Sequence, residues 1–313
     1  NSGYGSEVAY ANTDYIAWFN ISGYIDSGDS GSAFDLARTI LIVNQSIIYG
    51  TTNNQIYAYY PNGTQKWNIT GLEDSVNEMD LADVNDDGTM DIIAAHYGDN
   101  ISAINGIDGT LLWESADFSA LSVTAVDLDS DGEKDEFAVG HWSNAMRLIN
   151  STGDSLFNYN MGGTGDTVES IVGDFDGDGY ENEIGVESND LKLLQCNLTA
   201  CIEIWSYDYG CGGEHIWADD VNDDGNLDLI FGGSWSDNVC IVDNNGSLLY
   251  KIEVNDSIGF GSSYGSSAAI STGDINNDGI MDLVFGSRNN NVYVTMQSSC
   301  VISFNDSTTH NMT

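Results

Sequence analysis

Apolar residues in this chain recur in short runs that polar turns separate. A run such as IIAA from Ile92 is followed by a segment in which apolar and polar residues alternate, such as ISAI from Ile101. A turn of Asp108 and Gly109 comes next, and then a last segment that carries a bulky residue, Trp113. Short apolar runs are typical of buried strands, and alternation is typical of half-exposed strands. The pattern therefore predicts a succession of β-strands.

An acidic segment precedes five of these apolar runs and marks a repeat. The five copies are DVNDDGTMD from Asp83, DLDSDGEKD from Asp127, DFDGDGYEN from Asp174, DVNDDGNLD from Asp220 and DINNDGIMD from Asp274. Their first residues are separated by 44, 47, 46 and 54 positions. A further strand precedes each acidic segment, for example LSVTAV from Leu121. Each unit is thus expected to be four antiparallel strands, with the acidic loop joining the first two.

Repeats of this length, arranged radially, predict an all-β fold, a β-propeller of four-stranded antiparallel blades. Six complete units span residues 38–307, because the segment from Arg38 to Thr70 fits the same frame without the acidic loop. Residues 1–23 resemble only the outer hairpin of another unit, and 308–313 form a tail. We expect a single propeller domain over 1–313, with six or seven blades. A linear β-solenoid is the alternative, although its repeats are usually shorter and its strands parallel.

The acidic segments have the composition of a cation-binding loop. Positions 1, 3, 5 and 9 carry carboxylates or carboxamides, position 6 is always Gly, and position 7 offers a main-chain oxygen. Ca²⁺ needs six to eight oxygen ligands, and Gly permits the tight turn that brings alternate residues to one point. Turns of Asp or Asn with Gly that bind no metal are the alternative, which five copies disfavour.

The sequence therefore predicts about five Ca²⁺ ions, one in each copy. The predicted ligands are Asp83, Asn85, Asp87, Thr89 and Asp91; Asp127, Asp129, Asp131, Glu133 and Asp135; Asp174, Asp176, Asp178, Tyr180 and Asn182; Asp220, Asn222, Asp224, Asn226 and Asp228; and Asp274, Asn276, Asp278, Ile280 and Asp282.

The charge of the chain limits its partners. There are 49 Asp and Glu against 7 Lys and Arg, which gives a formal net charge of -42. Such a polyanion repels nucleic acids and anionic membrane surfaces and attracts cations. Apolar residues make up 41% of the chain, enough for a packed core. No apolar stretch approaches the ~20 residues of a membrane-spanning helix, so we expect no membrane span.

Glycosylation signals and cysteines favour an extracellular or cell-surface protein. Eleven Asn-x-Ser/Thr triplets, in which we expect N-linked glycans, begin at Asn20, Asn44, Asn62, Asn68, Asn100, Asn150, Asn197, Asn245, Asn255, Asn305 and Asn311. The abundance of Asn, Ser and Thr in turns is the alternative explanation. Cys196 and Cys201 flank a predicted turn, where a local disulfide is plausible. The pairing of the other three cysteines stays open.

The five loops with their following strands resemble the calcium-binding FG-GAP or VCBS-type repeats of integrin-like β-propellers. The cation motif carries the resemblance, and Phe231-Gly232 and Phe285-Gly286 keep part of the Phe-Gly signature. The resemblance implies calcium sites in the hairpins between first and second strands. It also implies a role in adhesion, ligand display or extracellular scaffolding.

We expect a calcium-stabilised extracellular glycoprotein with a structural or adhesive role, and not an enzyme. It could be the polymerising subunit of a surface filament or layer, which self-associates through strand exchange or propeller stacking. The alternative is a carbohydrate-active or quinoprotein-like propeller enzyme, because hairpins such as YYPNGTQKW from Tyr59 look like quinoprotein repeats. No basic cluster that could hold a quinone's carboxylates and no catalytic motif is found in the sequence. His96 and His141 lie at equivalent ends of second strands, where packing is the favoured role.

Overall fold

The structure of the chain is a computed structural model. It describes residues 8–11, 15–20, 23–29, 37–43, 46–97, 100–115, 120–141, 145–162, 169–187, 190–211, 215–232, 238–253, 270–275, 281–286, 291–296 and 300–305. Within these ranges all regular elements are β-strands. They form seven antiparallel sheets, six of four strands and one of three.

The three-stranded sheet, called the N-terminal sheet, contains β1 (Val8–Ala11), β2 (Tyr15–Asn20) and β3 (Gly23–Asp29). Blade 1 contains β4 (Ala37–Val43), β5 (Ser46–Thr51), β6 (Gln55–Tyr59) and β7 (Gln65–Thr70). Blade 2 contains β8 (Val76–Ala82), β9 (Asp91–His96), β10 (Ile101–Ile104) and β11 (Leu111–Ser115). Blade 3 contains β12 (Ala120–Val126), β13 (Glu136–His141), β14 (Ala145–Ile149) and β15 (Ser155–Asn160).

Blade 4 contains β16 (Glu169–Gly173), β17 (Glu183–Glu187), β18 (Leu191–Cys196) and β19 (Cys201–Tyr207). Blade 5 contains β20 (His215–Asp219), β21 (Asp228–Gly232), β22 (Asn238–Val242) and β23 (Leu248–Glu253). Blade 6 contains β24 (Ile270–Gly273), β25 (Asp282–Gly286), β26 (Asn291–Met296) and β27 (Cys300–Asn305).

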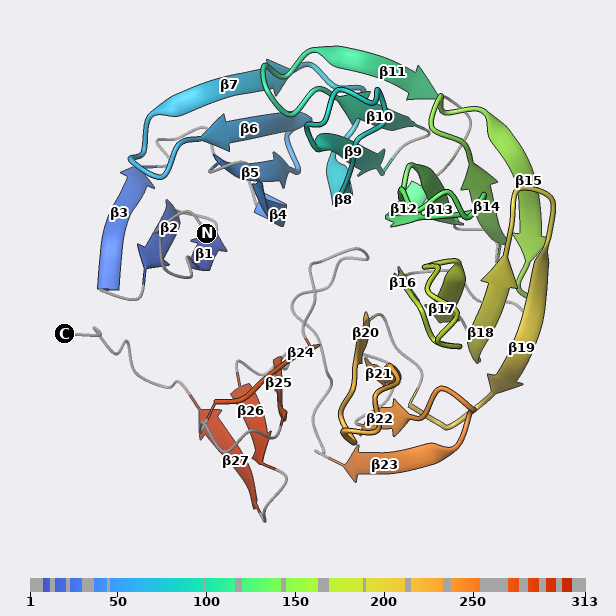
Figure 1. Ribbon diagram of the computed structural model, residues 1–313. Helices are drawn as coiled ribbons and strands as arrows, with labels where there is room; N and C mark the ends of the chain where they lie inside the picture. Colours follow the sequence, from blue (N-terminus) through green and yellow to red (C-terminus); the bar gives the residue numbers. More distant parts are fainter. Residues whose placement is uncertain are drawn as a thin grey trace.

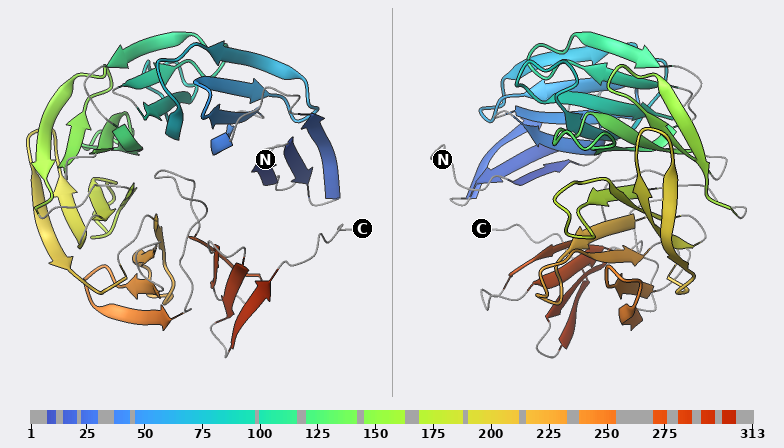
Figure 2. Two further views of the ribbon diagram at one scale, coloured as in Figure 1. Left: turned by 180° about the vertical axis from the view of Figure 1, so that it is seen from behind. Right: turned by 45° about the vertical axis from the view of Figure 1, so that its right-hand side comes forward.

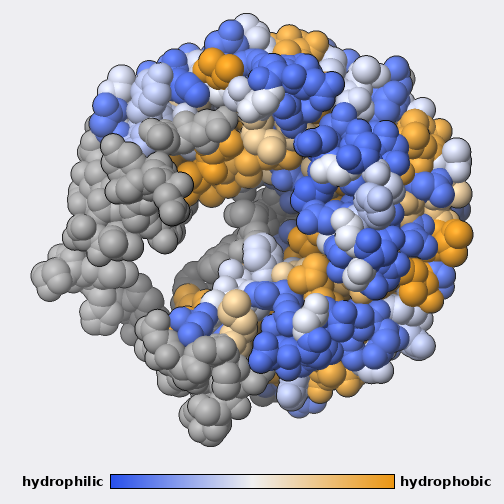
Figure 3. Space-filling model, in the orientation of Figure 1, coloured by the Kyte–Doolittle hydropathy of each residue, from blue (hydrophilic) through white to orange (hydrophobic). Residues whose placement is uncertain are grey.

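The sheets are arranged around a ring, with the first strand of each blade nearest the centre and the fourth on the outside (Figure 1). The N-terminal sheet and blade 6 lie on either side of a break in this ring, and the views from other directions show the same arrangement (Figure 2). The space-filling view shows an opening at the centre of the ring (Figure 3). Antiparallel pairing and radial arrangement exclude the linear parallel solenoid.

The predicted blade organisation is confirmed. Each acidic segment joins the first strand of its blade to the second, as in blade 2, where residues 83–90 connect β8 to β9. The N-terminal prediction was incomplete, because β3 adds a third strand to the two-stranded hairpin expected at 1–23. The sequence of β3, GYIDSGD, has little of the apolar alternation that identifies a strand.

The apolar core lies between neighbouring blades. One cluster joins Ile93 and Ala103 of blade 2 to Val123 and Phe137 of blade 3, and similar clusters occur at the four other junctions between blades 1 and 6. A second strand such as β9 has neighbours on both faces and is buried along its whole length. This double burial explains why second strands are almost continuously apolar in the sequence, whereas fourth strands alternate.

Aromatic residues on fourth strands pack against turns of the next blade. Trp67 of β7 lies against Gly109 and Trp113 of β11 lies against Gly153, in each case so closely that a Cβ on the glycine would come within 2.8 Å of the indole. Trp205 lies less closely against Gly246 of blade 5, at 3.1 Å from the same position, and donates its Nε1–H to a main-chain oxygen of that turn at 2.7 Å. These tryptophans therefore fix the angle between consecutive sheets.

Candidate metal centres

The first four acidic segments fold into loops of one shape. The five segments are called loop 1 (83–91), loop 2 (127–136), loop 3 (174–183), loop 4 (220–228) and loop 5 (274–282). In loop 1 the carboxylate of Asp83 accepts the N–H of Asp87 at 3.1 Å and that of Gly88 at 2.7 Å. The side-chain oxygens of Asn85 and Asp87 accept the N–H groups two residues further on, both at 2.9 Å. Alternate side chains are thus all turned into the loop.

The same bonds recur at equivalent positions of loops 2, 3 and 4. Position 6 is a left-handed Gly in all four loops, for example Gly132 at φ 97°. Position 4 is left-handed as well, even where it is Asp86, Ser130 or Asp223. Two left-handed residues in a short loop bring successive side-chain oxygens to one side of the backbone. Residues 276–280 of loop 5, with the predicted ligands Asn276, Asp278 and Ile280, lie outside the described residues.

A buried acid at the start of each second strand closes the loop. In loop 4 this is Asp228, which accepts the N–H of Val221 at 3.0 Å, and in loop 5 it is Asp282. In loops 2 and 3 the equivalent acids are Glu136 and Glu183, which accept N–H groups at 2.9 and 3.2 Å. With Asp91 of loop 1, these five acids are at most 5% exposed.

In loops 2 and 3 the acid that closes the loop is not the residue predicted as the ligand at position 9. Glu136, and not the predicted Asp135, closes loop 2, and Glu183, and not the predicted Asn182, closes loop 3. The Nδ2 of Asn182 instead lies 3.4 Å from the Oγ of Ser130 in loop 2. Both loops contain one residue more between their Gly and the following strand than loops 1, 4 and 5. Alignment on the apolar run after the loop, instead of on the Gly, would have found the glutamates.

Three carboxylates converge in each of loops 2 and 3. One oxygen each of Asp127, Asp129 and Glu136 lies within 4.8 Å of the others, and the same holds for Asp174, Asp176 and Glu183. Every side-chain donor is an oxygen, and an oxygen that accepts an N–H keeps a lone pair for a cation. The donor set therefore fits a hard divalent ion, and the number of donors favours Ca²⁺ over Mg²⁺.

The raised pKa values of the closing acids agree with cation binding in the loops. Burial, together with the charges of neighbouring carboxylates, raises the pKa of Glu136 and of Glu183 to about 7. The same causes raise the pKa of Asp91 and of Asp228 to about 6. A bound cation would favour the charged form of each of these acids.

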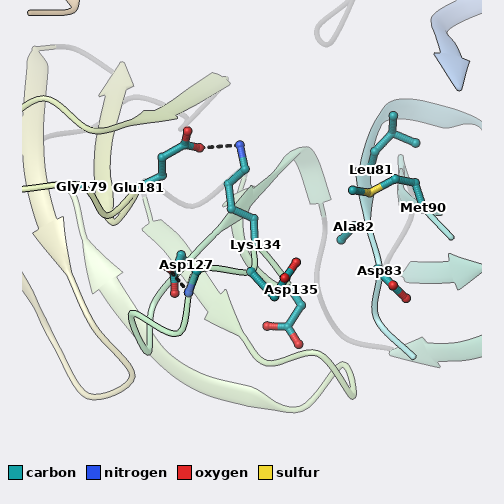
Figure 4. Close-up of a pocket in the computed structure, with 11 residues that line it drawn as sticks. Leu81, Ala82, Asp83, Met90, Asp127, Lys134, Asp135, Gly179 and Glu181 are labelled. Atoms are coloured by element: carbon teal, nitrogen blue, oxygen red, sulfur yellow. Dashed lines mark hydrogen bonds and ion pairs between the residues drawn. The ribbon is translucent and has the colours of Figure 1, made fainter. Parts of the chain in front are cut away.

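A cavity of about 310 Å³ lies between loops 1, 2 and 3 (Figure 4). Leu81 and Met90 line it from blade 2, and Lys134 and Asp135 line it from loop 2. The Nζ of Lys134 is ion-paired with Glu181 of loop 3 at 2.5 Å. The polar side chains of the cavity are thus carboxylates and one lysine that is already paired, an arrangement that joins loops 2 and 3.

Comparison with known proteins agrees with this architecture. Residues 220–285, which run from loop 4 through loop 5 into β25, match the FG-GAP-like repeat family. The chain is a β-propeller with an FG-GAP-like repeat. Among curated proteins no sequence matches this propeller significantly.

Solved structures show the same fold. BamB from Moraxella catarrhalis superimposes with a TM-score of 0.64 at 12% identity, over 98% of this chain and 84% of BamB. The WD40 β-propeller domain of Doa1 gives a TM-score of 0.65 at 14% identity, over 94% and 90% of the two chains. Sqt1 from Saccharomyces cerevisiae gives 0.64 at 11% identity, over 94% and 78%. At these identities the likeness shows the fold alone.

Four predicted glycosylation sites occupy the same place in the propeller. Asn62, Asn150, Asn197 and Asn245 lie in the turns between third and fourth strands of blades 1, 3, 4 and 5, and each side-chain oxygen accepts the N–H of the Ser or Thr two residues on. These turns lie at the same end of the blades as the acidic loops, since the Gly106 N–H of such a turn bonds to Asp91. We call this end the loop face and the opposite end the far face.

Asn100 differs from these sites. It lies on the far face and is 5% exposed, and its Nδ2 donates to Glu73 at 2.9 Å and to Glu114 at 3.1 Å. These two hydrogen bonds and the burial disfavour the glycan predicted at Asn100, because the Nδ2 atom that would carry it is already bonded to two carboxylates. Asn68 is exposed on β7. The side chains of Asn20, Asn44, Asn255, Asn305 and Asn311 lie outside the described residues.

Two disulfides are formed. Cys196 is bonded to Cys201 across the turn of blade 4, with the Cα atoms 4.0 Å apart. Cys211 is bonded to Cys240, with the Cα atoms 5.9 Å apart, a pairing that the sequence left open. Disulfides are typical of the extracellular space and the periplasm. Among the described residues no helix has the length and apolar character needed to span a bilayer.

Proposed function

We propose that this propeller is a calcium-stabilised extracellular glycoprotein with a structural or adhesive role. The observation that carries the proposal is the common geometry of loops 1 to 4, in which oxygens that are two residues apart are turned to one side of the loop. The two disulfides support an oxidising compartment. The FG-GAP-like repeat supports the extracellular role by analogy.

Calcium would be held by the side chains at positions 1, 3 and 5 and by the closing acid of each loop. In loop 2 these are Asp127, Asp129, Asp131 and Glu136. The ion would neutralise carboxylates that otherwise repel one another across a few ångströms. At a free Ca²⁺ concentration a hundred times Kd, each site contributes about 2.7 kcal/mol to the free energy of unfolding. Several such sites would equal the whole stability of many domains.

Calcium stoichiometry in matched variants tests the metal sites. Glu136→Gln is expected to remove one bound Ca²⁺ or to weaken that site strongly, because the closing carboxylate is lost. Asp135→Asn removes the same charge one residue away and is expected to leave the stoichiometry unchanged. Equilibrium dialysis with elemental analysis measures both. Absence of bound Ca²⁺ in the native protein, or equal losses in the two variants, would contradict the proposal.

The glycans would form a row on the loop face. The turns of Asn62, Asn150, Asn197 and Asn245 recur from blade to blade on this side, and three of these four asparagines are exposed while Asn150 is half-buried. Glycans there would leave the far face for contacts with other molecules. Peptide mass spectrometry of native material, before and after enzymatic deglycosylation, reports which sites are occupied.

We propose self-association through the N-terminal sheet. Its three described strands are one fewer than in each blade, and an incomplete sheet accepts a strand from another chain through main-chain hydrogen bonds. Analytical ultracentrifugation and electron microscopy in Ca²⁺ are expected to show oligomers or filaments. A homogeneous monomer at every concentration tested would rule out this mode of assembly and leave the calcium sites unaffected.

A further inference from the structure

Loops 2 and 3 are joined by three polar contacts. The N–H of Asp127, the first residue of loop 2, donates to the main-chain oxygen of Glu181 in loop 3 at 3.1 Å. The Nζ of Lys134 in loop 2 is ion-paired with the carboxylate of the same Glu181 (Figure 4). The Nδ2 of Asn182 in loop 3 lies 3.4 Å from the Oγ of Ser130 in loop 2. We call these three contacts the bridge.

The bridge lies beside predicted cation ligands of both loops. Asp127 provides one of the three carboxylates that converge in loop 2, and the N–H of the same residue is the donor to loop 3. Glu181 and Asn182 directly precede Glu183, the acid that closes loop 3. A change in the position of residues 181–183 would therefore move the main chain at the first ligand of loop 2.

The ion pair of the bridge depends on residues that the other loops lack. Position 8 of the loop is Lys134 in loop 2 and Glu181 in loop 3. It is apolar in loops 1, 4 and 5, where it is Met90, Leu227 and Met281. Loops 1 and 2 both lie wholly within the described residues, and no hydrogen bond or ion pair joins them there. The junction of loops 1 and 2 is therefore a reference without a bridge.

Apolar contacts behind the loops are similar at both junctions. Leu128, at position 2 of loop 2, belongs to one core cluster with Ile184, which follows the closing acid of loop 3. Val84, at position 2 of loop 1, packs against the cluster that contains Phe137, which follows the closing acid of loop 2. A difference in coupling between the two junctions would therefore come mainly from the bridge.

Two sites are coupled when binding at one favours the arrangement that the other needs. In the absence of a cation, the carboxylates of each loop repel one another and oppose the closed arrangement. Glu183, once it is held by a cation, would fix Glu181 and Asn182, and the bridge would then hold the N–H of Asp127 in place. Linkage makes this effect reciprocal. Repulsion between two bound divalent ions opposes the coupling, but it acts at both junctions.

We propose that loops 2 and 3 are a pair of Ca²⁺ sites coupled through the bridge, in which occupation of either site raises the affinity of the other. This inference rests on the calcium binding proposed above. Coupling between two sites typically changes affinity by about 5- to 150-fold. The ion pair of the bridge is half-exposed and contributes little by itself, so we expect the lower end of this range, about fivefold.

Calcium titration of matched closing-acid variants tests the coupling. Glu183→Gln removes the closing carboxylate of loop 3, and its amide oxygen can still accept the N–H of Phe175. This variant is expected to lose its own ion and to bind a second ion about fivefold more weakly. Asp91→Asn makes the equivalent change in loop 1 and is the control, which is expected to lose one ion and to leave the other affinities within about twofold of the wild type. Isothermal titration calorimetry with a competing chelator measures these affinities.

Glu136→Gln in loop 2 gives the reciprocal measurement, and also the test if Glu183→Gln does not fold. It is expected to weaken the site of loop 3 by the same factor. A bridge variant combines Lys134→Met and Asn182→Ala, which remove side-chain contacts and leave the predicted carboxylate ligands in place. In this background, loss of either closing acid is expected to weaken the neighbouring site less than it does in the wild type. Lys251→Met removes the same charge from blade 5 and is expected to leave the fivefold effect unchanged.

The outcomes separate this inference from the proposed function. Absence of bound Ca²⁺ would contradict both. A wild type that binds Ca²⁺, with closing-acid variants of loops 2 and 3 that each lose one ion and keep every other affinity, would overturn the coupling and leave the calcium sites intact. Equal weakening of the neighbouring site with and without the side chains of the bridge would also count against it, because the coupling would then not depend on them.

Discussion

The loop face and the far face both gather carboxylates at the ends of strands, but in different ways. On the loop face the acids of one site lie within ten residues of one another, and the arrangement repeats from blade to blade. On the far face, Glu78 and Glu169 each accept a main-chain N–H of the next blade, and His215 of blade 5 lies beside Glu169 of blade 4. Local sites depend mainly on the conformation of one loop, whereas the far-face group depends on how the blades pack together.

The largest expected effect is the removal of calcium from the loop face. Chelation is expected to lower the melting temperature by more than about 10 °C, because several sites are lost at about 2.7 kcal/mol each and the acids then repel one another. Calorimetry with and without chelator measures the shift. An unchanged melting temperature would show that no bound ion on the loop face stabilises the fold.

Acidification tests how much the buried His96, which lies at the far face, contributes to stability. Burial lowers the pKa of this histidine to about 4, below the 6.5 of an exposed imidazole. The unfolded chain then binds more protons than the native chain, so stability is fully present above pH 6.5 and is lost as the pH falls toward 4. The loss is about 3 kcal/mol at about 1.4 kcal/mol per pH unit.

Urea unfolding of the wild type and of His96→Gln between pH 7 and 4.5 isolates this contribution, since other acids titrate equally in both proteins. The variant is expected to lose less stability on acidification. If both proteins lost the same free energy of unfolding between pH 7 and 4.5, protonation of His96 would not contribute to the loss of stability in acid.

A substitution at Gly153, which lies outside the acidic loops, tests packing on the loop face without changing a predicted metal ligand. This residue has φ 82°, and a Cβ would lie 2.7 Å from the indole of Trp113. Gly71 has φ 80° with no atom within 4 Å of the same position. Gly71→Ala is expected to cost about 1 kcal/mol of backbone strain, and Gly153→Ala about 1–2 kcal/mol more because the indole must move. Equal losses in chemical denaturation would show that the contact contributes little.

The smallest effect concerns glycan occupancy on the two faces. Asn245→Gln is expected to lower the mass of native material by one glycan, whereas Asn100→Gln is expected to remove none, because the nitrogen of Asn100 is buried against two carboxylates. Intact-mass measurement of both variants makes the comparison. A glycan at Asn100 would require this part of the far face to open.

The sequence predicted the features that repeat at short range. Strand order, loop position and the side-chain oxygens that turn into loops 1 to 4 follow from spacing within a single unit. Glu136 and Glu183 were missed because one additional residue shifts the closing acid, and the longer side chain of Glu compensates for the shift in space. The surroundings of His215 could not be predicted, because they are formed by other blades whose relation to it only the folded ring defines.

The location of the core between blades has a mechanical consequence. Each sheet is held mainly by the side chains of its two neighbours, so a pulling force along the chain would detach one blade at a time. Extension of a tethered molecule would then show a series of separate ruptures, and the blades between them would stay folded. Such stepwise yielding would suit a protein that bears load outside the cell.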